Sequence, residues 1–265
     1  MRLKDKSIIV TGSCTGIGKA IAKRCASEGA RVVIHGLERD WGESLVAEIG
    51  PDKATLLIED LKHPDCAGNL VDLAVNSFGK LDAVVNNAAI VASGDVHTTD
   101  LIEFRRILEI NTLAPYRLIQ AALPDLTETS GNVLNIGSVN AWCGEPNLMA
   151  YSVSKGALMT LTRNLGDTLM RENGVRVNQI NPGWVLTENE ALRKREHGLK
   201  EDWAADLPKM FAPAGRILKP EEIAAAAVYW LADECGPVSG QVVDLEQHPF
   251  IGRNPPKDGD MIPDL

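Results

Sequence analysis

Short apolar runs alternate with stretches of helical periodicity along almost the whole chain. The runs end in glycine or polar residues, as buried strands do where they close at a turn. The expected strands span residues 7–10, 31–35, 54–58, 81–85, 132–136, 175–180 and 241–245. Near-continuous apolar strands that alternate with helices are typical of a parallel sheet that helices cover on both faces. We therefore predict an α/β fold with a seven-stranded, mostly parallel sheet.

The residues between these runs show the three- and four-residue apolar spacing of helices. The longest such stretch runs from about Asp100 to Leu123. Asp100 is the expected N-cap, and Pro115 predicts a kink nearby. Another long helix is expected to begin near Tyr151 and to end at Asn173-Gly174.

No break in composition separates two domains, so residues 1–250 are expected to form one domain. Within it, residues 184–215 form an irregular region with helical pieces, which we interpret as a substrate loop. Residues 251–265 form a tail rich in proline and aspartate, to which no role is assigned.

The formal net charge of −9 disfavours nucleic acid and anionic membranes as partners. The N-terminus does not resemble a secretory signal, and no run approaches the roughly 20 apolar residues that a membrane span needs. The five cysteines form no C-x-x-C pair, which favours free thiols in a reducing compartment. We therefore expect a cytoplasmic protein with no metal site.

The first strand leads into a glycine-rich loop, Thr11-Gly12-x-x-x-Gly16-Ile17-Gly18. Glycines at such a turn let the main chain approach a pyrophosphate, and the N-terminus of the next helix favours the anion. The same glycines could serve only turn formation and helix packing. Their place after the first strand of an alternating chain favours a nucleotide site.

Tyr151 and Lys155 are four residues apart at the start of a predicted helix, so they share one helix face. A free phenol has a pKa of about 10, and a nearby ammonium would lower it toward neutrality. The pair is therefore a candidate acid–base couple, with the Ser138 hydroxyl beside it. A surface helix with a solvated lysine gives the same spacing, so the motif depends on its context.

Polar residues gather at the ends of several expected strands: Asp60, Asn86-Asn87, Ser138 and Asn181. Each alone is a common turn former. Because ligands bind at the carboxyl ends of strands in open parallel sheets, together they predict one shared cleft beside the glycine-rich loop.

From about residue 5 to 245 the chain resembles the short-chain dehydrogenase/reductase family. The resemblance rests jointly on the glycine-rich loop, Asp60, Asn86-Asn87-Ala88, Asn111, Ser138, Tyr151-x-x-x-Lys155 and Pro182-Gly183. It implies a single-domain Rossmann fold and an NAD(P)-dependent oxidoreductase. Such an enzyme transfers a hydride between nicotinamide and a secondary alcohol or ketone.

The resemblance also implies roles for individual residues. Tyr151 would be the general acid/base, Lys155 would lower its pKa and bind the nicotinamide ribose, and Ser138 would orient the substrate. Asn111 would hold a water that links Lys155 to solvent. The implied cofactor contacts are Gly12, Thr15, Gly16, Ile17, Gly18, Leu37, Asp60, Leu61, Asn87, Ala88, Tyr151, Lys155, Pro182, Gly183 and Thr187.

The choice between NAD and NADP depends on the end of the second strand. In the family, NAD enzymes usually carry an acid there, and NADP enzymes a base at the position of Thr15 or Leu37. Here Gly36-Leu37 is followed by Glu38, which would repel a 2′-phosphate, and Arg39, which would attract one. We favour NAD, with NADP as the alternative.

Trp142, Glu145 and Trp184 are candidate walls of the substrate pocket, although each also fits ordinary packing. Their mixture of aromatic and polar groups favours a sugar or polyol. The alternative function is a catalytically silent dinucleotide-binding sensor or scaffold. The resemblance further implies a homo-oligomer, a tetramer or a dimer. Asp244 is followed by Leu245-Glu246 where the family commonly has Gly-Gly, so the path of the C-terminal segment is not predicted.

Overall fold

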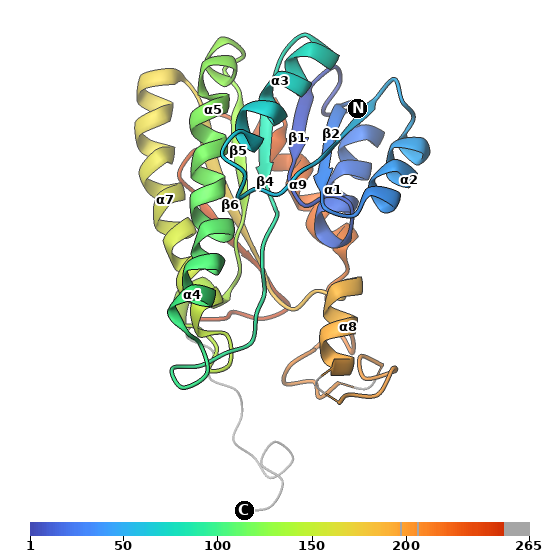
Figure 1. Cartoon of the computed structure of the whole chain (residues 1–265), viewed down its shortest axis with the longest axis vertical. Coiled ribbons are helices and arrows are strands. Elements are labelled where there is room, and N and C mark those ends of the chain that lie inside the picture. Colours follow the sequence, from blue (N-terminus) through green and yellow to red (C-terminus); the bar gives the residue numbers. More distant parts are fainter. Residues whose placement is uncertain (197, 206, 252–265) are drawn as a thin grey trace, which may run out of the picture.

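A computed structural model describes residues 1–196, 198–205 and 207–251. The tail predicted at 251–265 lies outside these residues apart from Ile251. One sheet of seven parallel strands organises the chain, in the order β3-β2-β1-β4-β5-β6-β7 (Figure 1). The strands are β1 (Ser7–Val10), β2 (Arg31–Gly36), β3 (Ala54–Ile58), β4 (Ala83–Asn86), β5 (Asn132–Ile136), β6 (Arg176–Pro182) and β7 (Val242–Leu245). The predicted fold is confirmed, and the sheet is entirely rather than mostly parallel.

Helices cover both faces of the sheet because adjacent strand residues point to opposite sides. Ile8 and Val10 of β1 pack in one apolar cluster, while Ile9 packs in the other. The first cluster includes residues of α1 (Gly16–Ser27), α2 (Arg39–Ile49) and α9 (Pro220–Leu231), and the second those of α3 (Cys66–Phe78), α5 (Ala114–Glu128) and α7 (Met149–Asn173). The remaining helices are α4 (Leu101–Leu108), α6 (Asn140–Cys143), α8 (Glu188–Glu196), the π-helical turn η1 (Glu109–Leu113) and the 3₁₀ turn η2 (Asp233–Cys235).

The long helix expected from Asp100 to Leu123 is interrupted. Asp100 is its N-cap as predicted, since its carboxylate accepts the Glu103 N–H at 2.8 Å. The interruption is η1, which ends immediately before α5, where Pro115 occupies the first turn. Pro115 has no N–H to donate to the turn that precedes it, and the π-helical turn immediately before it fits this missing bond.

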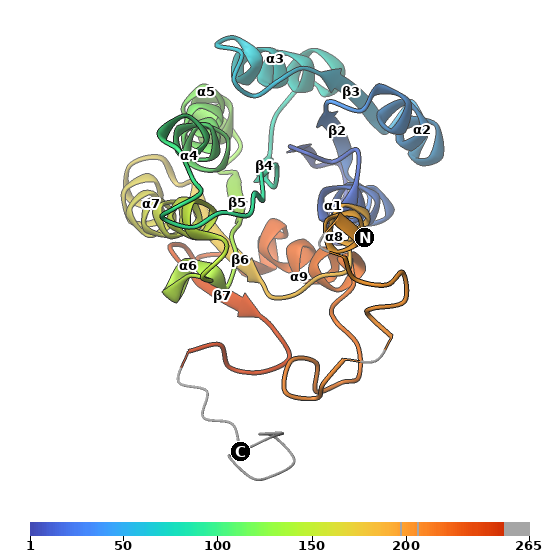
Figure 2. The ribbon, with the colours of Figure 1, turned by 60° about the horizontal axis from the view of Figure 1, so that its bottom comes forward.

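The strand order reverses between β1 and β4, which places the loops after these two strands side by side. In such sheets the crevice outside the strand carboxyl ends is where ligands bind. Figure 2, which brings this end forward, shows α8 overlying α1. Among the described residues, no helix combines the length and apolar character needed to span a bilayer.

Candidate active site

The glycine-rich loop between β1 and α1 is held tightly against the loop that follows β4. Gly12 has a left-handed φ of +61°, and a Cβ there would lie 2.8 Å from Ala88 Cα. A Cβ on Gly18 would lie 2.4 Å from Asn87 Nδ2 and from the Gly12 carbonyl oxygen. The Asn87 amide donates to the carbonyls of Thr11 and Gly12, at 2.9 Å each. Only glycine fits these two positions, and Asn87 fixes the shape of the loop.

The N-terminus of α1 presents main-chain donors to an anion. Thr15 makes no side-chain capping bond, and the first turn of α1 contains no acidic residue. The Gly16 N–H instead donates to the carboxylate of Glu188, 3.2 Å away in the first turn of α8. This carboxylate stands in for a phosphate oxygen, because both are anionic acceptors that a helix N-terminus favours. The loop therefore fits the pyrophosphate of a dinucleotide.

Three of the predicted catalytic side chains lie together between the end of β5 and the start of α7. Tyr151 (9% exposed) and Lys155 (2%) lie on α7, and Ser138 (8%) follows β5. The Ser138 hydroxyl hydrogen-bonds the Tyr151 phenol. Lys155 Nζ lies 5.8 Å from the centroid of the Tyr151 ring and donates to the Ile136 carbonyl at 2.7 Å. The hydroxyl, the phenol and the amine thus form one buried polar group.

Burial is the largest influence on the pKa values of Tyr151 and Lys155. The pKa of Tyr151 is raised, chiefly because the phenol is desolvated, while the Ser138 hydrogen bond and the Arg193 charge oppose the shift. Burial also lowers the pKa of Lys155 to about 7, so its amine is only partly charged at neutral pH. The lowering of the phenol's pKa by Lys155 remains a prediction, and burial of both groups opposes it.

Asn111 lies in the π-helical turn η1 and is fully buried. Its side chain accepts the Ile90 N–H at 2.8 Å and donates to the Ile90 carbonyl at 2.9 Å and to Ser154 Oγ at 3.0 Å. Both amide protons are thus used, which pins the loop after β4 to α7. π-helical turns are frequent at functional sites. The water relay remains a prediction. Because both Nδ2 protons are already donated, a water could bind Asn111 only through Oδ1 or the main chain.

The other predicted cofactor contacts follow strand ends along the same edge of the sheet. Leu37 follows β2, Asp60 and Leu61 follow β3, Asn87 and Ala88 follow β4, and Pro182, Gly183 and Thr187 lie at or after the end of β6. Leu37 is 62% exposed, and Asp60 accepts the Lys62 N–H at 2.9 Å. The Thr187 hydroxyl accepts the Glu190 N–H at 3.1 Å, so it caps α8.

Glu145 and the segment around Trp184 carry charges that act on Tyr151. The charges of Glu145 and Glu190 raise the pKa of the phenol, and that of Arg193 lowers it. Trp184 stacks on Trp203 with ring centroids 5.2 Å apart. Trp184 Nε1 donates to Glu190 at 2.9 Å, which links the aromatic pair to this charged group.

Trp142 does not join this group. Its Nε1 donates to both carboxylate oxygens of Asp244 on β7, at 2.9 and 3.0 Å. The Arg163 guanidinium lies 5.0 Å from the centroid of its ring. The side chain is therefore held at the edge strand rather than against the phenol.

Two acidic residues near the cleft, Glu188 and Glu246, were not predicted from the sequence. Glu188 lies on the glycine-rich loop, and Thr187-Glu188-Asn189-Glu190 matches the capping-box pattern that could have predicted the start of α8. Glu246 accepts the Trp184 N–H at 2.9 Å and so connects the C-terminal segment to the substrate loop. No local pattern predicts that contact, because the two residues are distant in sequence.

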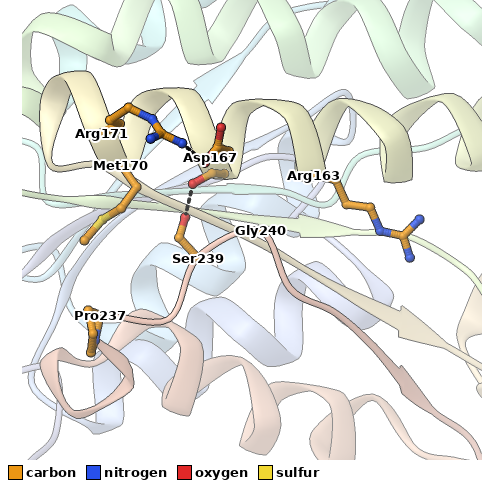
Figure 3. Close-up of a pocket in the computed structure, with 8 residues that line it drawn as sticks. Arg163, Asp167, Met170, Arg171, Pro237, Ser239 and Gly240 are labelled. Atoms are coloured by element: carbon orange, nitrogen blue, oxygen red, sulfur yellow. Dashed lines mark hydrogen bonds and ion pairs between the residues drawn. The ribbon is translucent and has the colours of Figure 1, made fainter.

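A separate hollow lies between α7 and the segment before β7 (Figure 3). A Cβ on Gly166 would lie 2.3 Å from Gly240 Cα, and Ser239 Oγ donates to the Gly166 carbonyl at 2.7 Å. This region is a close helix–strand contact, roughly 20 Å along α7 from Tyr151 at 1.5 Å per residue. Among the described residues, no group of three or more His, Cys, Asp or Glu side chains could hold a metal ion.

Comparisons with known proteins agree with this geometry. The family model described as enoyl-(acyl carrier protein) reductase matches residues 12–246. Glucose 1-dehydrogenase 2 of Bacillus subtilis is 33% identical over 250 residues, which cover 92% of this chain and 94% of the relative. The NADP-dependent (R)-specific alcohol dehydrogenase of Lentilactobacillus kefiri is 34% identical over 240 residues, covering 88% and 92%. The 3-ketoacyl-(acyl-carrier-protein) reductase of Brucella melitensis, solved with NADH, has a TM-score of 0.81 at 28% identity, covering 92% of this chain and 97% of that one.

Proposed function

Since this chain belongs to the short-chain dehydrogenase/reductase family, we propose that Tyr151, Ser138 and Lys155 perform its proton transfer. The protein is an NAD(P)-dependent oxidoreductase that transfers a hydride between nicotinamide and an alcohol or carbonyl substrate. The relatives give no support to a silent sensor. The observation that carries the proposal is the common burial of Ser138, Tyr151 and Lys155, with Lys155 Nζ 5.8 Å from the centroid of the Tyr151 ring.

The roles of the side chains follow from their positions. When bound, the nicotinamide supplies or accepts the hydride. In ketone reduction the Tyr151 phenol donates its proton to the carbonyl oxygen, and in alcohol oxidation it takes the proton back. The Ser138 hydroxyl orients the same substrate oxygen. Lys155, whose ammonium donates to the Ile136 carbonyl at 2.7 Å, is the proposed partner of the nicotinamide ribose.

NAD is the proposed cofactor because a carboxylate lies at the end of β2. Glu38 Oε2 accepts the Leu37 N–H at 3.2 Å and would lie 3.2 Å from a Cβ on Gly36. The side chain therefore turns back to the strand end, where an acid binds a ribose 2′-hydroxyl and repels a 2′-phosphate. The nearby Arg39 pairs with Glu43 instead.

Replacing Glu38 with glutamine is expected to move cofactor preference toward NADP. Loss of the charge removes repulsion of the 2′-phosphate, so the ratio of NADP⁺ to NAD⁺ affinity should rise by roughly 5- to 50-fold, about 1–2.3 kcal/mol for one close charge pair at a solvated surface. Binding titrations with both cofactors measure the ratio. Glu48→Gln, which removes a charge from the far end of α2 and leaves the Arg39–Glu43 pair intact, is the matched control. An unchanged ratio in Glu38→Gln would contradict this assignment.

We propose a sugar or polyol as the substrate class, because Glu145, Glu190 and Arg193, whose charges act on the phenol, supply several hydrogen-bonding groups. The named glucose dehydrogenase among the relatives supports the same class. A panel of sugars, polyols, hydroxy acids and steroids, each with both cofactors, tests it by the absorbance of the reduced nicotinamide. Polyhydroxy compounds should give the highest kcat/KM. Turnover confined to steroids would contradict the substrate class, and cofactor binding without any turnover would favour the sensor.

We also propose a cytoplasmic homo-oligomer, a tetramer or a dimer. The apolar side chains of Leu113, Tyr116 and Val153 are exposed on η1, α5 and α7 and would suit a subunit interface. Leu158 and Leu169 of α7 are buried in the chain's own core and do not belong to this exposed surface. All five cysteines are free, in keeping with a reducing compartment.

A further inference from the structure

Glu188 links two parts of the chain that are 172 residues apart in sequence. It belongs to the first turn of α8, and its carboxylate accepts the N–H of Gly16, the first residue of α1. Figure 1 shows α8 below α1, at the end of the molecule where the strands terminate. The contact therefore occupies one of the donors that the glycine-rich loop offers to a pyrophosphate.

The arrangement favours a negative charge at this point from two sides. Glu188 lies at the N-terminus of its own helix and faces the N-terminus of another, and both helix dipoles stabilise an anion there. The neighbouring Thr187 reinforces the contact, because its Cγ2 would lie 3.4 Å from a Cβ on Gly16. The same threonine caps α8 through the Glu190 N–H, so the helix start is fixed over the loop.

We infer that Glu188 competes with the cofactor's pyrophosphate for the glycine-rich loop and so limits cofactor affinity. The inference rests on dinucleotide binding at this loop, as proposed above. A pyrophosphate oxygen and the Glu188 carboxylate need the same Gly16 N–H, and their like charges repel at hydrogen-bonding distance. Cofactor entry therefore requires Glu188 to leave.

Displacement of Glu188 also affects residues of the proposed substrate loop. The same first turn of α8 carries Glu190, which accepts from Trp184 at 2.9 Å and from Arg193 at 2.8 Å. A movement of α8 that frees the loop thus also moves Glu190 and the Trp184 side chain bonded to it, so cofactor binding is coupled to the substrate loop through one helix.

The test compares wild type with Glu188→Gln and a control, Glu196→Gln, by titration with NADH, ADP-ribose and adenosine. Glu196 is exposed at the other end of α8, so its substitution makes the same change of charge on the same helix. Glu188→Gln should bind NADH and ADP-ribose roughly 3- to 30-fold more tightly than wild type, the range expected for a carboxylate at a helix N-terminus. Adenosine, which lacks a pyrophosphate, should bind all three proteins equally, and Glu196→Gln should match wild type.

The other possible results contradict either the competition at Gly16 or the cofactor site itself. Equal or weaker binding of ADP-ribose by Glu188→Gln overturns the competition, while leaving dinucleotide binding intact. An equal gain in Glu196→Gln assigns the effect to the net charge of α8 rather than to the Gly16 contact. Failure of all three proteins to bind NADH or NADPH overturns the cofactor site and, with it, this inference.

Discussion

Replacement of Tyr151 by phenylalanine is expected to lower kcat by roughly 10²- to 10⁴-fold, the usual contribution of a positioned general acid or base. The change removes only the hydroxyl that hydrogen-bonds Ser138, and the ring that covers Lys155 Nζ remains. The glycine-rich loop is untouched, so the affinity for NADH should stay within about 2-fold of wild type, less than 0.5 kcal/mol. Steady-state turnover and a cofactor titration on the same preparation measure both quantities.

Tyr229→Phe is the matched control for this variant. Tyr229 lies on α9 with 40% of its surface exposed, and it should lose its hydroxyl without loss of turnover. A Tyr151→Phe protein that is folded, binds NADH and turns over like wild type would exclude Tyr151 as the acid/base. Loss of NADH affinity along with turnover would instead make it a cofactor-binding residue.

Replacement of Gly18 by alanine is expected to abolish measurable cofactor binding, a loss of at least about 100-fold or 2.7 kcal/mol. The new Cβ would lie 2.4 Å from both Asn87 Nδ2 and the Gly12 carbonyl, so the loop must shift. That shift breaks the Asn87 bonds to Thr11 and Gly12 and misplaces the donors at the start of α1. Titration with NADH, together with a thermal melt, separates lost binding from lost folding.

Gly68 offers the matched control, because it lies within α3 and a Cβ on it would meet nothing within 4 Å. Gly68→Ala should keep full cofactor affinity and gain up to about 1 kcal/mol of stability from helix propensity. Wild-type NADH affinity in a folded Gly18→Ala protein would show that the loop is not the pyrophosphate site.

The strand–helix alternation made the fold predictable, since buried parallel strands and amphipathic helices leave clear periodic patterns. The sequence also singles out Gly12, Gly18 and the Tyr151–Lys155 pair, because each depends on local chain geometry and a short spacing. The π-helical turn at Asn111 was not predicted, as its apolar pattern continues that of α4 and α5. Only tertiary contacts to Ile90 and Ser154 fix it.

The effect of burial on the acidity of the site could not be predicted for a similar reason. Sequence spacing brings Lys155 near Tyr151, but it carries no information on how deeply both are buried. Desolvation raises the pKa of the phenol and lowers that of the amine, which opposes the expected stabilisation of a phenolate. Long-range contacts such as Glu188 to Gly16 and Glu246 to Trp184 were likewise beyond any local pattern.

The pH dependence of turnover in both directions, compared between wild type and Tyr151→Phe, tests the central claim most directly. Alcohol oxidation needs the phenol without its proton and ketone reduction needs it protonated. Because burial raises the pKa of Tyr151, kcat/KM for oxidation should still be rising with pH in the alkaline range, while reduction falls only at the alkaline end. The rising limb should disappear in Tyr151→Phe together with most of the rate. A Tyr151→Phe enzyme that keeps both the wild-type rate and the wild-type limb would contradict proton transfer by this residue.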